Sequence, residues 1–538
     1  MKGKVFNRTT YNLKHKTKKT MTLYLWFVFF LAVQVIHFLG TWKLYEAAGR
    51  KKWEAAIPVY NSIILMKIIS RPTWWTILLF IPIINLIMFP VVWVETLRTF
   101  GKKSTLDTLL GIFTFGFYIY YVNYTQKLEY NANRELRPQN KTADTVSSLL
   151  FAIIVATLVH TYVVQPYTIP TSSLEKSLLI GDFLFVSKVN YGPRVPMTTV
   201  ALPMVHDTIP FVKRKSYLSW PQLPYFRLPA LEKIKRSDIV VFNWPVDTVH
   251  YFYEPKGRPG VIKPIDKKSN YVKRCVGIPG DSLSIVDGFV FINGKKLILP
   301  ERAKPQYSYS VALDGKTPVD FESLMKELDI TDGAYIKDQE KRDTIYFRAL
   351  TEASAERLKN TPGITAVKRE IDRGNDNAIF PHINKWSQDN FGPIYIPQAG
   401  KTVALTNESL PFYKEIITKY EGNTLQLDGS HFLINGKQAT TYTFKQDYYW
   451  MMGDNRHNSE DSRYWGYVPA NHIVGKPVFI WMSWDTNGKG INKVRWDRVF
   501  TTVNGEGQPQ SYFKYFLIIL AAYFVGEYFW RKRKENKA

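Results

Sequence analysis

Ile169-Pro-Thr-Ser-Ser-Leu-Glu-Lys-Ser-Leu-Leu-Ile-Gly-Asp-Phe183 is the stretch from which the organisation of this chain can be worked out. It places a cluster of hydroxyl side chains a few residues after an uncharged apolar segment, and its second half predicts a strand. Two later stretches have a similarly dense mixture of polar and apolar residues: Tyr271-Val-Lys-Arg-Cys-Val-Gly-Ile-Pro-Gly-Asp281 and Gly453-Asp-Asn-Arg-His-Asn-Ser-Glu-Asp-Ser-Arg463. A reactive hydroxyl needs a base close by, so these two stretches are candidates for the rest of a catalytic site.

The composition indicates a membrane partner. The 538 residues are 45% hydrophobic and carry a net charge of +25. Positive charge is dense beside apolar segments, which favours anionic lipid, and no nucleic-acid-binding signature occurs, so nucleic acid is not expected as a partner. The single cysteine, Cys275, excludes an intrachain disulfide and a Cys-based zinc site.

Five apolar runs predict membrane spans: residues 21–40, 73–94, 108–126, 146–164 and 515–530. Residues 57–66 form a shorter run, for which a re-entrant or interfacial helix is as good an interpretation. The surrounding pattern, residues 48–61, resembles a small bacterial membrane domain of unassigned function. The basic C-terminal tail predicts a cytoplasmic end, with residues 165–512 outside the cytoplasm, while the side of the basic N-terminus stays open.

The region between the last two predicted spans is rich in strand signals. Residues 238–245 predict a strand, and residues 283–299 predict three strands joined by Asp-Gly and Asn-Gly turns. Residues 427–437 repeat the pattern of residues 286–295, which suggests a duplicated hairpin. Between these hairpins, residues 343–349, 351–360 and 364–370 predict a β-α-β insert without a catalytic constellation.

A serine nucleophile in this chain lacks an obvious histidine base. No G-x-S-x-G elbow occurs, the nine histidines are scattered, and His457 is expected to be a surface polar residue. Ser173-Leu-Glu-Lys176 matches the S-x-x-K motif of penicillin-binding proteins, but the chain has no Lys-Thr-Gly or Ser-Asp-Asn to complete that set. The penicillin-binding interpretation therefore stays an alternative.

Lys273 is the other candidate base. Strand alternation places it on the same face as Tyr271 and Cys275, opposite Val272 and Arg274. Burial among apolar neighbours would lower the pKa of its ammonium, as a general base requires. An ordinary strand lysine paired with an acid is the better interpretation of this stretch when it is taken alone.

Taken together, the three stretches resemble the signature boxes of bacterial type I signal peptidases, Ser-Lys proteases that release exported proteins from the membrane. Residues 169–183 resemble the serine box, residues 273–281 the lysine box, and residues 453–466 the third signature, with His457 and Glu460 at tolerant positions. The resemblance covers about residues 146–481, and not the N-terminal spans or the insert.

The resemblance implies a role for each matching residue. Ser173 would be the nucleophile and Lys273 the general base, with Thr171 and the Ser173 N–H forming the oxyanion hole. Ser459 would orient the lysine beside structural ion pairs, and three apolar residues would shape small pockets that prefer Ala-x-Ala; the ion-pair residues are Asp454, Asp461, Arg463 and Arg274, and the pocket residues are Tyr167, Ile169 and Val272.

One departure concerns the serine box. The family's serine is usually followed by Met, any residue, Pro and Thr, whereas this chain has Leu174-Glu-Lys-Ser177. Lys176 in place of the proline removes a rigid turn and leaves Ser172 as a rival nucleophile.

The sequence thus predicts a multi-pass α-helical membrane anchor plus a mainly-β extracytoplasmic catalytic domain with an α+β insert. Its expected parts are a membrane domain (1–145), an anchor (146–164), two catalytic parts (165–300 and 446–512) around an insert (301–445), and a C-terminal span with a basic tail (513–538). We expect a signal-peptide-removing serine endopeptidase of the bacterial cytoplasmic (inner) membrane, without metal or other cofactor. Its expected partners are signal-peptide-bearing precursors, the lipid bilayer and the protein export machinery; a catalytically inactive membrane scaffold is the alternative.

Overall fold

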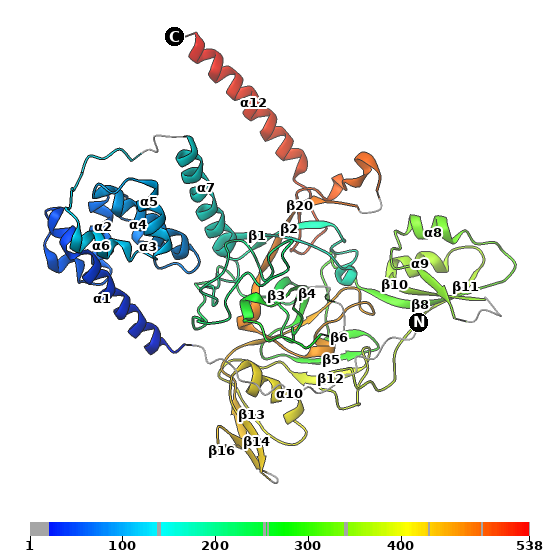
Figure 1. The fold of residues 1–538 in the computed structure, drawn as a ribbon. Coiled ribbons are helices and arrows are strands. Elements are labelled where there is room, and N and C mark those ends of the chain that lie inside the picture. The colour runs from blue at the N-terminus through cyan, green and yellow to red at the C-terminus, as the bar shows by residue number, and fades with distance from the viewer. Residues whose placement is uncertain are drawn as a thin grey trace.

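The computed structural model describes residues 21–136, 141–250, 254, 258–337, 343–428, 431–485 and 488–536. A helical N-terminal part lies on one side of a β-rich body, and a single helix near the C-terminus extends away from that body (Figure 1). The helices that precede the body are α1 (Leu23–Ala47), α2 (Tyr60–Ile68), α3 (Trp75–Leu78), α4 (Ile84–Thr99), α5 (Thr105–Phe113), α6 (Tyr118–Thr125) and α7 (Lys141–Leu158).

Three helices in the described ranges are long and apolar enough to cross a membrane: α1, α7 with its π-helical extension Val159–Val163, and α12 (Phe513–Glu535). The pair α5 and α6, bent by 119°, makes a fourth candidate if the two helices form one span. No residue of α12 is buried, so its apolar side chains are free to face lipid.

The prediction of a span at residues 73–94 is wrong. The helix stops at Leu78, and α4 begins only after Ile83, whose φ is 71°. Pro82 explains the break, because proline lacks an amide hydrogen and disfavours helical backbone in the residue before it. The same break occurs at Val59, with φ 67°, directly after Pro58 and before α2. With 16 residues, α4 is shorter than a typical span.

The main sheet of the body is antiparallel and brings the three motif stretches together. Its strand order is β1 (Val164–Thr168), β2 (Asp182–Ser187), β20 (Ile473–Ser483), β3 (Ile239–Asn243), β4 (Asn270–Gly277), β18 (Tyr448–Met452) and β19 (Val468–Pro469), with β21 (Thr501–Thr502) beside β20. The serine stretch connects β1 to β2, the lysine stretch is β4, and the third stretch follows β18. The strand predicted at residues 238–245 is β3.

In the described residues, four smaller sheets accompany the main one. The predicted β-α-β insert is confirmed as β10-α9-β11, and both predicted hairpins are three-stranded meanders, β5-β6-β7 and β14-β15-β16, with residues 429–430 between β14 and β15 outside the described residues. The sheets are β12 (Phe391–Tyr395) with β5 (Ser282–Val286), β6 (Phe289–Ile292) and β7 (Lys295–Lys296); β11 (Ile364–Arg369) with β8 (Gln306–Leu313), β10 (Thr344–Thr351) and β9 (Ala334–Ile336); β13 (Thr402–Ala404) with β17 (Thr441–Thr443); and β14 (Leu425–Asp428) with β15 (His431–Ile434) and β16 (Lys437–Gln438). The helices of this region are α8 (Phe321–Glu327), α9 (Glu352–Lys359), α10 (Leu410–Glu415) and α11 (Ser462–Trp465).

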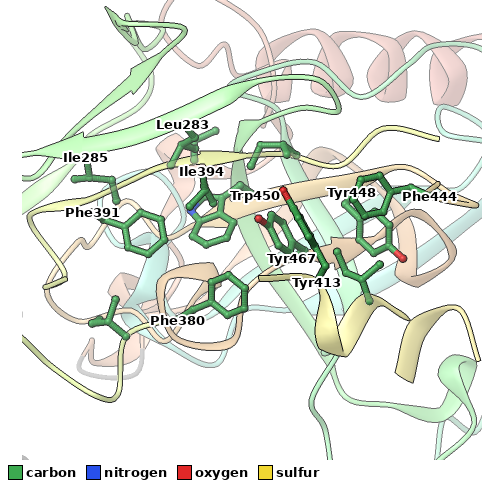
Figure 2. Close-up of a cluster of buried hydrophobic side chains, with 14 of the residues drawn as sticks. Leu283, Ile285, Phe380, Phe391, Ile394, Tyr413, Phe444, Tyr448, Trp450 and Tyr467 are labelled. Atoms are coloured by element: carbon green, nitrogen blue, oxygen red, sulfur yellow. The ribbon is translucent and has the colours of Figure 1, made fainter. Parts of the chain in front are cut away.

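The largest buried cluster is centred on Trp450 of β18 (Figure 2). Leu283 of β5, Phe391 of β12 and Tyr467 pack in the same cluster. The cluster contains side chains from both sides of the two domain boundaries that the sequence predicts, at residues 301 and 445. The division into domains at these positions stays a prediction. This packing holds β18 in place, so the third motif stretch begins from a rigid strand.

Candidate active site

Ser173 and Lys273 are in direct contact. Ser173 lies in a one-turn 3₁₀ helix, Ser172–Leu174, between β1 and β2, and Lys273 is on β4. The Lys273 Nζ donates a hydrogen bond of 2.6 Å to the Ser173 Oγ. Both residues are buried, with exposed fractions of 7% and 4%. The two residues are 100 positions apart in the chain, and the main sheet brings them together.

The surroundings of Lys273 favour its neutral form. Burial lowers the pKa of its ammonium to about 8, although the carboxylates of Asp461, Glu460 and Asp454 oppose this shift. The Nζ also lies 5.3 Å from the centre of the Tyr271 ring, on the strand face that alternation predicts. A lysine with a pKa near 8 is neutral often enough at physiological pH to accept a proton.

The two rivals from the sequence have other partners. The Ser172 Oγ accepts a hydrogen bond of 3.0 Å from the Asn458 side chain. Lys176 forms an ion pair of 2.7 Å with Asp329, and no hydrogen bond joins it to Ser173 in the described part of the chain. The segment after Ser173 continues into strand β2 rather than a helix. The S-x-x-K arrangement of the penicillin-binding proteins therefore does not form.

Two buried ion pairs flank the Ser173–Lys273 contact. Arg274 donates to both carboxylate oxygens of Asp454, at 2.8 and 2.6 Å. Arg463 donates to both oxygens of Asp461, at 2.9 and 2.8 Å. Each arginine holds the pKa of its partner carboxyl below the ordinary value, against the opposing effect of burial. The first of these two-point contacts joins β4 to the third motif stretch, and the second lies within that stretch.

Thr171 and Ser459 are both close to Ser173 in the structure. Thr171 precedes the 3₁₀ turn with extended backbone, at φ −135° and ψ 155°. Ser459 is 7% exposed, and no hydrogen bond joins it to Lys273 among the described residues.

Gly453 allows the end of β18 to approach the serine turn. A Cβ atom at this position would lie 2.5 Å from the carbonyl oxygen of Ser173 and 2.2 Å from the Ser459 Oγ. Two residues later, the Asn455 N–H donates to the same Ser173 carbonyl at 3.1 Å. Only glycine fits this approach, which explains why the third motif stretch begins with it.

The three predicted pocket residues meet beside the site. Ile169 is buried in a cluster beneath the serine turn, and Tyr167 and Val272 pack partly buried against the same cluster. Tyr167 and Ile169 alternate along the chain from β1, which pairs with β2, whereas Val272 comes from β4. The three residues therefore belong to one apolar cluster, which also contains Leu174 of the serine turn.

A contact between the insert and the serine turn was not predicted from the sequence. The loop after α8 places Asp329 on Lys176 and Asp332 within 2.5 and 3.1 Å of the Asn455 and Asn458 side-chain amides. Lys176 has a φ of 68°, which proline cannot adopt. The chain therefore holds its serine turn by contacts with the insert, where the family motif has a proline. Asn455 and Asn458 stand within the third motif stretch, but Asp329 and Asp332 belong to no motif.

His457 also differs from expectation. Its side chain is 9% exposed and lies 2.9 Å from Asp389, while the Ser308 N–H donates to its other ring nitrogen at 2.9 Å. It joins β8 to the third motif stretch instead of facing solvent.

The described residues contain no group of three or more His, Cys, Asp or Glu side chains that could hold a metal ion.

Comparison with known proteins identifies the class of this site. Residues 142–345 and 396–484 match the family described as signal peptidase, peptidase S26, and residues 53–133 match a family of unknown function. Among curated proteins, signal peptidase I of Helicobacter pylori strain 26695 is 26% identical over 67% of this chain and 92% of its own length. Signal peptidase I of Haemophilus influenzae is 24% identical, over 69% and 78%. Signal peptidase I of Buchnera aphidicola from Baizongia pistaciae is 23% identical, over 67% and 83%.

The site and fold are those of a serine endopeptidase built on a curled β-sheet and anchored in a membrane by helices. The chain belongs to the signal peptidase family, within which it resembles the bacterial type I enzymes and carries additional N-terminal helices.

Removing the carboxylate of Asp454 should destabilise the protein. Asp454→Asn leaves the buried Arg274 guanidinium without its full partner, which costs about 3 to 5 kcal/mol of folding free energy. We expect a clear fall in the midpoint of thermal unfolding in detergent. Asp343→Asn, at an exposed position of the insert, should leave the midpoint unchanged. Equal midpoints for Asp454→Asn and the wild type would contradict the structural role of this pair.

Loosening the insert from the serine turn should slow the enzyme without unfolding it. Asp332→Ala removes both contacts with the Asn455 and Asn458 amides, so we expect kcat to fall about tenfold or more, because each charge-assisted hydrogen bond is worth about 1.5 kcal/mol or more. Glu327→Ala is the control, because Glu327 forms only an exposed ion pair with Arg357 in the same insert. A kcat equal to that of the control would show that the loop does not support the turn.

Proposed function

We propose that this chain removes signal peptides from exported precursors with Ser173 as nucleophile and Lys273 as general base. The observation that carries the proposal is the 2.6 Å hydrogen bond between a buried lysine and a buried serine. No other described basic side chain makes a hydrogen bond to Ser173 Oγ. The family of the chain and the names of its relatives supply the reaction class.

The reaction follows from this geometry. Neutral Lys273 accepts the hydroxyl proton as the Ser173 Oγ attacks the carbonyl carbon at the cleavage point. The same lysine then gives the proton to the departing amine, which leaves an acyl-enzyme that water hydrolyses by the same steps. The Thr171 hydroxyl and the Ser173 N–H stabilise the oxyanion, and one such donor contributes about 3 kcal/mol. The family resemblance assigns Ser459 the orientation of the lysine, and its side chain lies against Gly453 at the end of β18.

Substrate preference follows from the apolar surface beside Ser173. Tyr167 and Val272 are partly exposed on the cluster that buries Ile169, so a substrate segment at this face would meet apolar side chains. An extended substrate segment there would place alternate residues against this surface, which supports cleavage after Ala-x-Ala. Larger side chains would clash with the packed cluster below.

The proposed membrane arrangement places the β-rich body outside the cytoplasm. The positive charges at the end of α12, beyond residue 530, favour a cytoplasmic tail, and α7 leads directly into β1 and the serine turn. The active site then lies near the membrane surface, where a signal peptide emerges from the bilayer. The export machinery is the expected source of these precursors.

Substitution of the two central residues tests the proposal. Ser173→Ala and Lys273→Ala should each lower kcat by more than about 10⁴-fold on a precursor with an Ala-x-Ala site, because the residues act as a unit. Ser172→Ala, at the rival serine, should keep most of the activity, whereas Lys176→Ala, which loosens the serine turn from the insert, should lose only about tenfold. The readout is cleavage by detergent-purified full-length protein.

The outcomes of this panel separate the alternatives. Loss of activity in Ser172→Ala but not in Ser173→Ala would move the nucleophile to Ser172. A folded wild type that cleaves nothing would favour the scaffold alternative.

The pH dependence of kcat/KM should report Lys273. The lysine works only when neutral, so activity should rise as pH increases through about 8 and fall about tenfold per pH unit below it. Glu460 raises the pKa of Lys273, so Glu460→Gln should move this limb to lower pH. A limb near the ordinary lysine value of 10.5, or one that Glu460→Gln moves upward, would refute this assignment.

A further inference from the structure

A cavity that contains neither Ser173 nor Lys273 lies between the helical N-terminal part and the β-rich body. It has a volume of about 130 Å³. A water molecule occupies about 30 Å³ in the liquid, so the cavity has room for a considerably larger group. Its walls come from the break before α4 (Ile83), the last turns of the α7 span (His160), the end of β2 (Lys188) and the loops that carry Arg194 and Lys267.

The charges that line this cavity are strongly unbalanced. Lys188, Arg194 and Lys267 carry formal positive charges, and Asp266 is the single acidic residue of the lining. Both carboxylate oxygens of Asp266 are already occupied, by the N–H and the hydroxyl of Thr198 at 2.9 and 2.7 Å. The only carboxylate of the lining is therefore held in place by a neutral residue.

The three cations have no carboxylate partner among the described residues. Arg194 donates to the Asn471 carbonyl and the Asn243 side chain, at 2.7 and 2.8 Å. Lys267, which is 6% exposed, donates to the His206 carbonyl at 2.7 Å. These neutral acceptors solvate the charges but do not cancel them.

Lys188 is the cation of the cavity whose charge is least compensated by its neighbours. Within the described ranges its Nζ has neither a hydrogen bond nor an ion pair. Burial, together with Arg194 and Arg227, lowers the pKa of Lys188 to about 7. Asp266 partly offsets the charge of Arg194, and Asp266 and Asp207 partly offset that of Lys267; a bound anion would offset the repulsion that Arg194 and Arg227 exert on Lys188.

The position of the cavity relates it to the bilayer. His160 lies close to the end of the apolar span Lys141–Val163. The end of a span marks the edge of the hydrocarbon region, where the phosphates of lipid headgroups begin. The cavity therefore lies at the depth of those phosphates.

One hairpin of the body joins this cavity to a surface suited to lipid. The bridges Thr198↔Gln222 and Thr208↔Lys215 define the hairpin. At its tip Phe211 is fully exposed and Val212 is 61% exposed, and three basic residues, 213–215, follow directly. An exposed apolar tip beside positive charges is typical of a segment that enters the membrane interface.

The same hairpin gives the cavity an apolar rim. Leu202 and Met204 line the cavity and are 45% and 47% exposed. A phospholipid offers the matching pair of groups, a phosphate for the basic interior and acyl chains for the rim. A free phosphate ion would use only the first.

We propose that this cavity binds the phosphate group of an anionic membrane phospholipid and so fixes the β-rich body against the bilayer beside the N-terminal helices. The proposal concerns the membrane part of the molecule and does not depend on which residues cleave the substrate.

The test uses the full chain in detergent, with short-chain phosphatidylglycerol, short-chain phosphatidylcholine or inorganic phosphate as the probe. Phosphatidylglycerol should raise the unfolding midpoint of the wild type by about 3 °C in a saturable manner. Phosphatidylcholine and inorganic phosphate should raise it less. Lys188→Gln and Lys267→Gln should abolish the response to phosphatidylglycerol, whereas Lys295→Gln, on the exposed strand β7, should keep it.

The midpoint without lipid provides a second readout. Lys188→Gln removes a half-buried charge that other cations repel, so its midpoint should equal or exceed that of the wild type even though it no longer responds to lipid. A residue with only a structural role would lower that midpoint. A full response in both Lys188→Gln and Lys267→Gln, or equal responses of the wild type to the two lipids, would overturn the proposal. An equal response to inorganic phosphate would also overturn it, because the cavity would then bind a free anion and not a lipid.

Discussion

Two neighbouring residues of β4 have buried basic side chains, and the electrostatic surroundings of these two side chains are opposite. Arg274 points toward Asp454, and two short hydrogen bonds compensate its charge. Lys273 points to the other face, where its Nζ meets a neutral hydroxyl and burial lowers its pKa. The arginine fixes β4 to the third motif stretch, and in the proposed mechanism the lysine beside it serves as the base. The geometry of the site depends on keeping these two environments apart across a single strand.

The serine turn is held from three directions. The main sheet holds it at β1 and β2, the third motif stretch reaches its carbonyl through Gly453 and Asn455, and the insert reaches it through Asp329. This last contact takes the place of a rigid proline by fixing Lys176 in a left-handed conformation. The insert is therefore connected to the chemistry of the chain although it carries none of the reacting groups.

Prediction from the sequence succeeded where local patterns are sufficient. Turn dipeptides located the two meanders, alternation placed Lys273 beside Tyr271, and composition located α1, α7 and α12. It failed at residues 73–94, because hydropathy does not register a backbone break at Pro82. It also had no means of finding Asp329 or Asp332, because their contacts join parts of the chain more than 100 residues apart. The basic cavity could not be predicted for the same reason, because its cations come from separate segments of the chain.

The distance along the chain between the parts of the site has a consequence for synthesis. Asn455 and Ser172, which contact each other, are separated by 283 residues. At about 5 to 20 residues per second, a ribosome needs roughly 15 to 60 seconds to make that interval. During this time the serine turn, already joined to its membrane helix, lacks both Gly453 and the carboxylate for Arg274. The growing chain is therefore inactive as a protease. The membrane helices that precede residue 453 are already made before the active site, which could cleave them, can assemble.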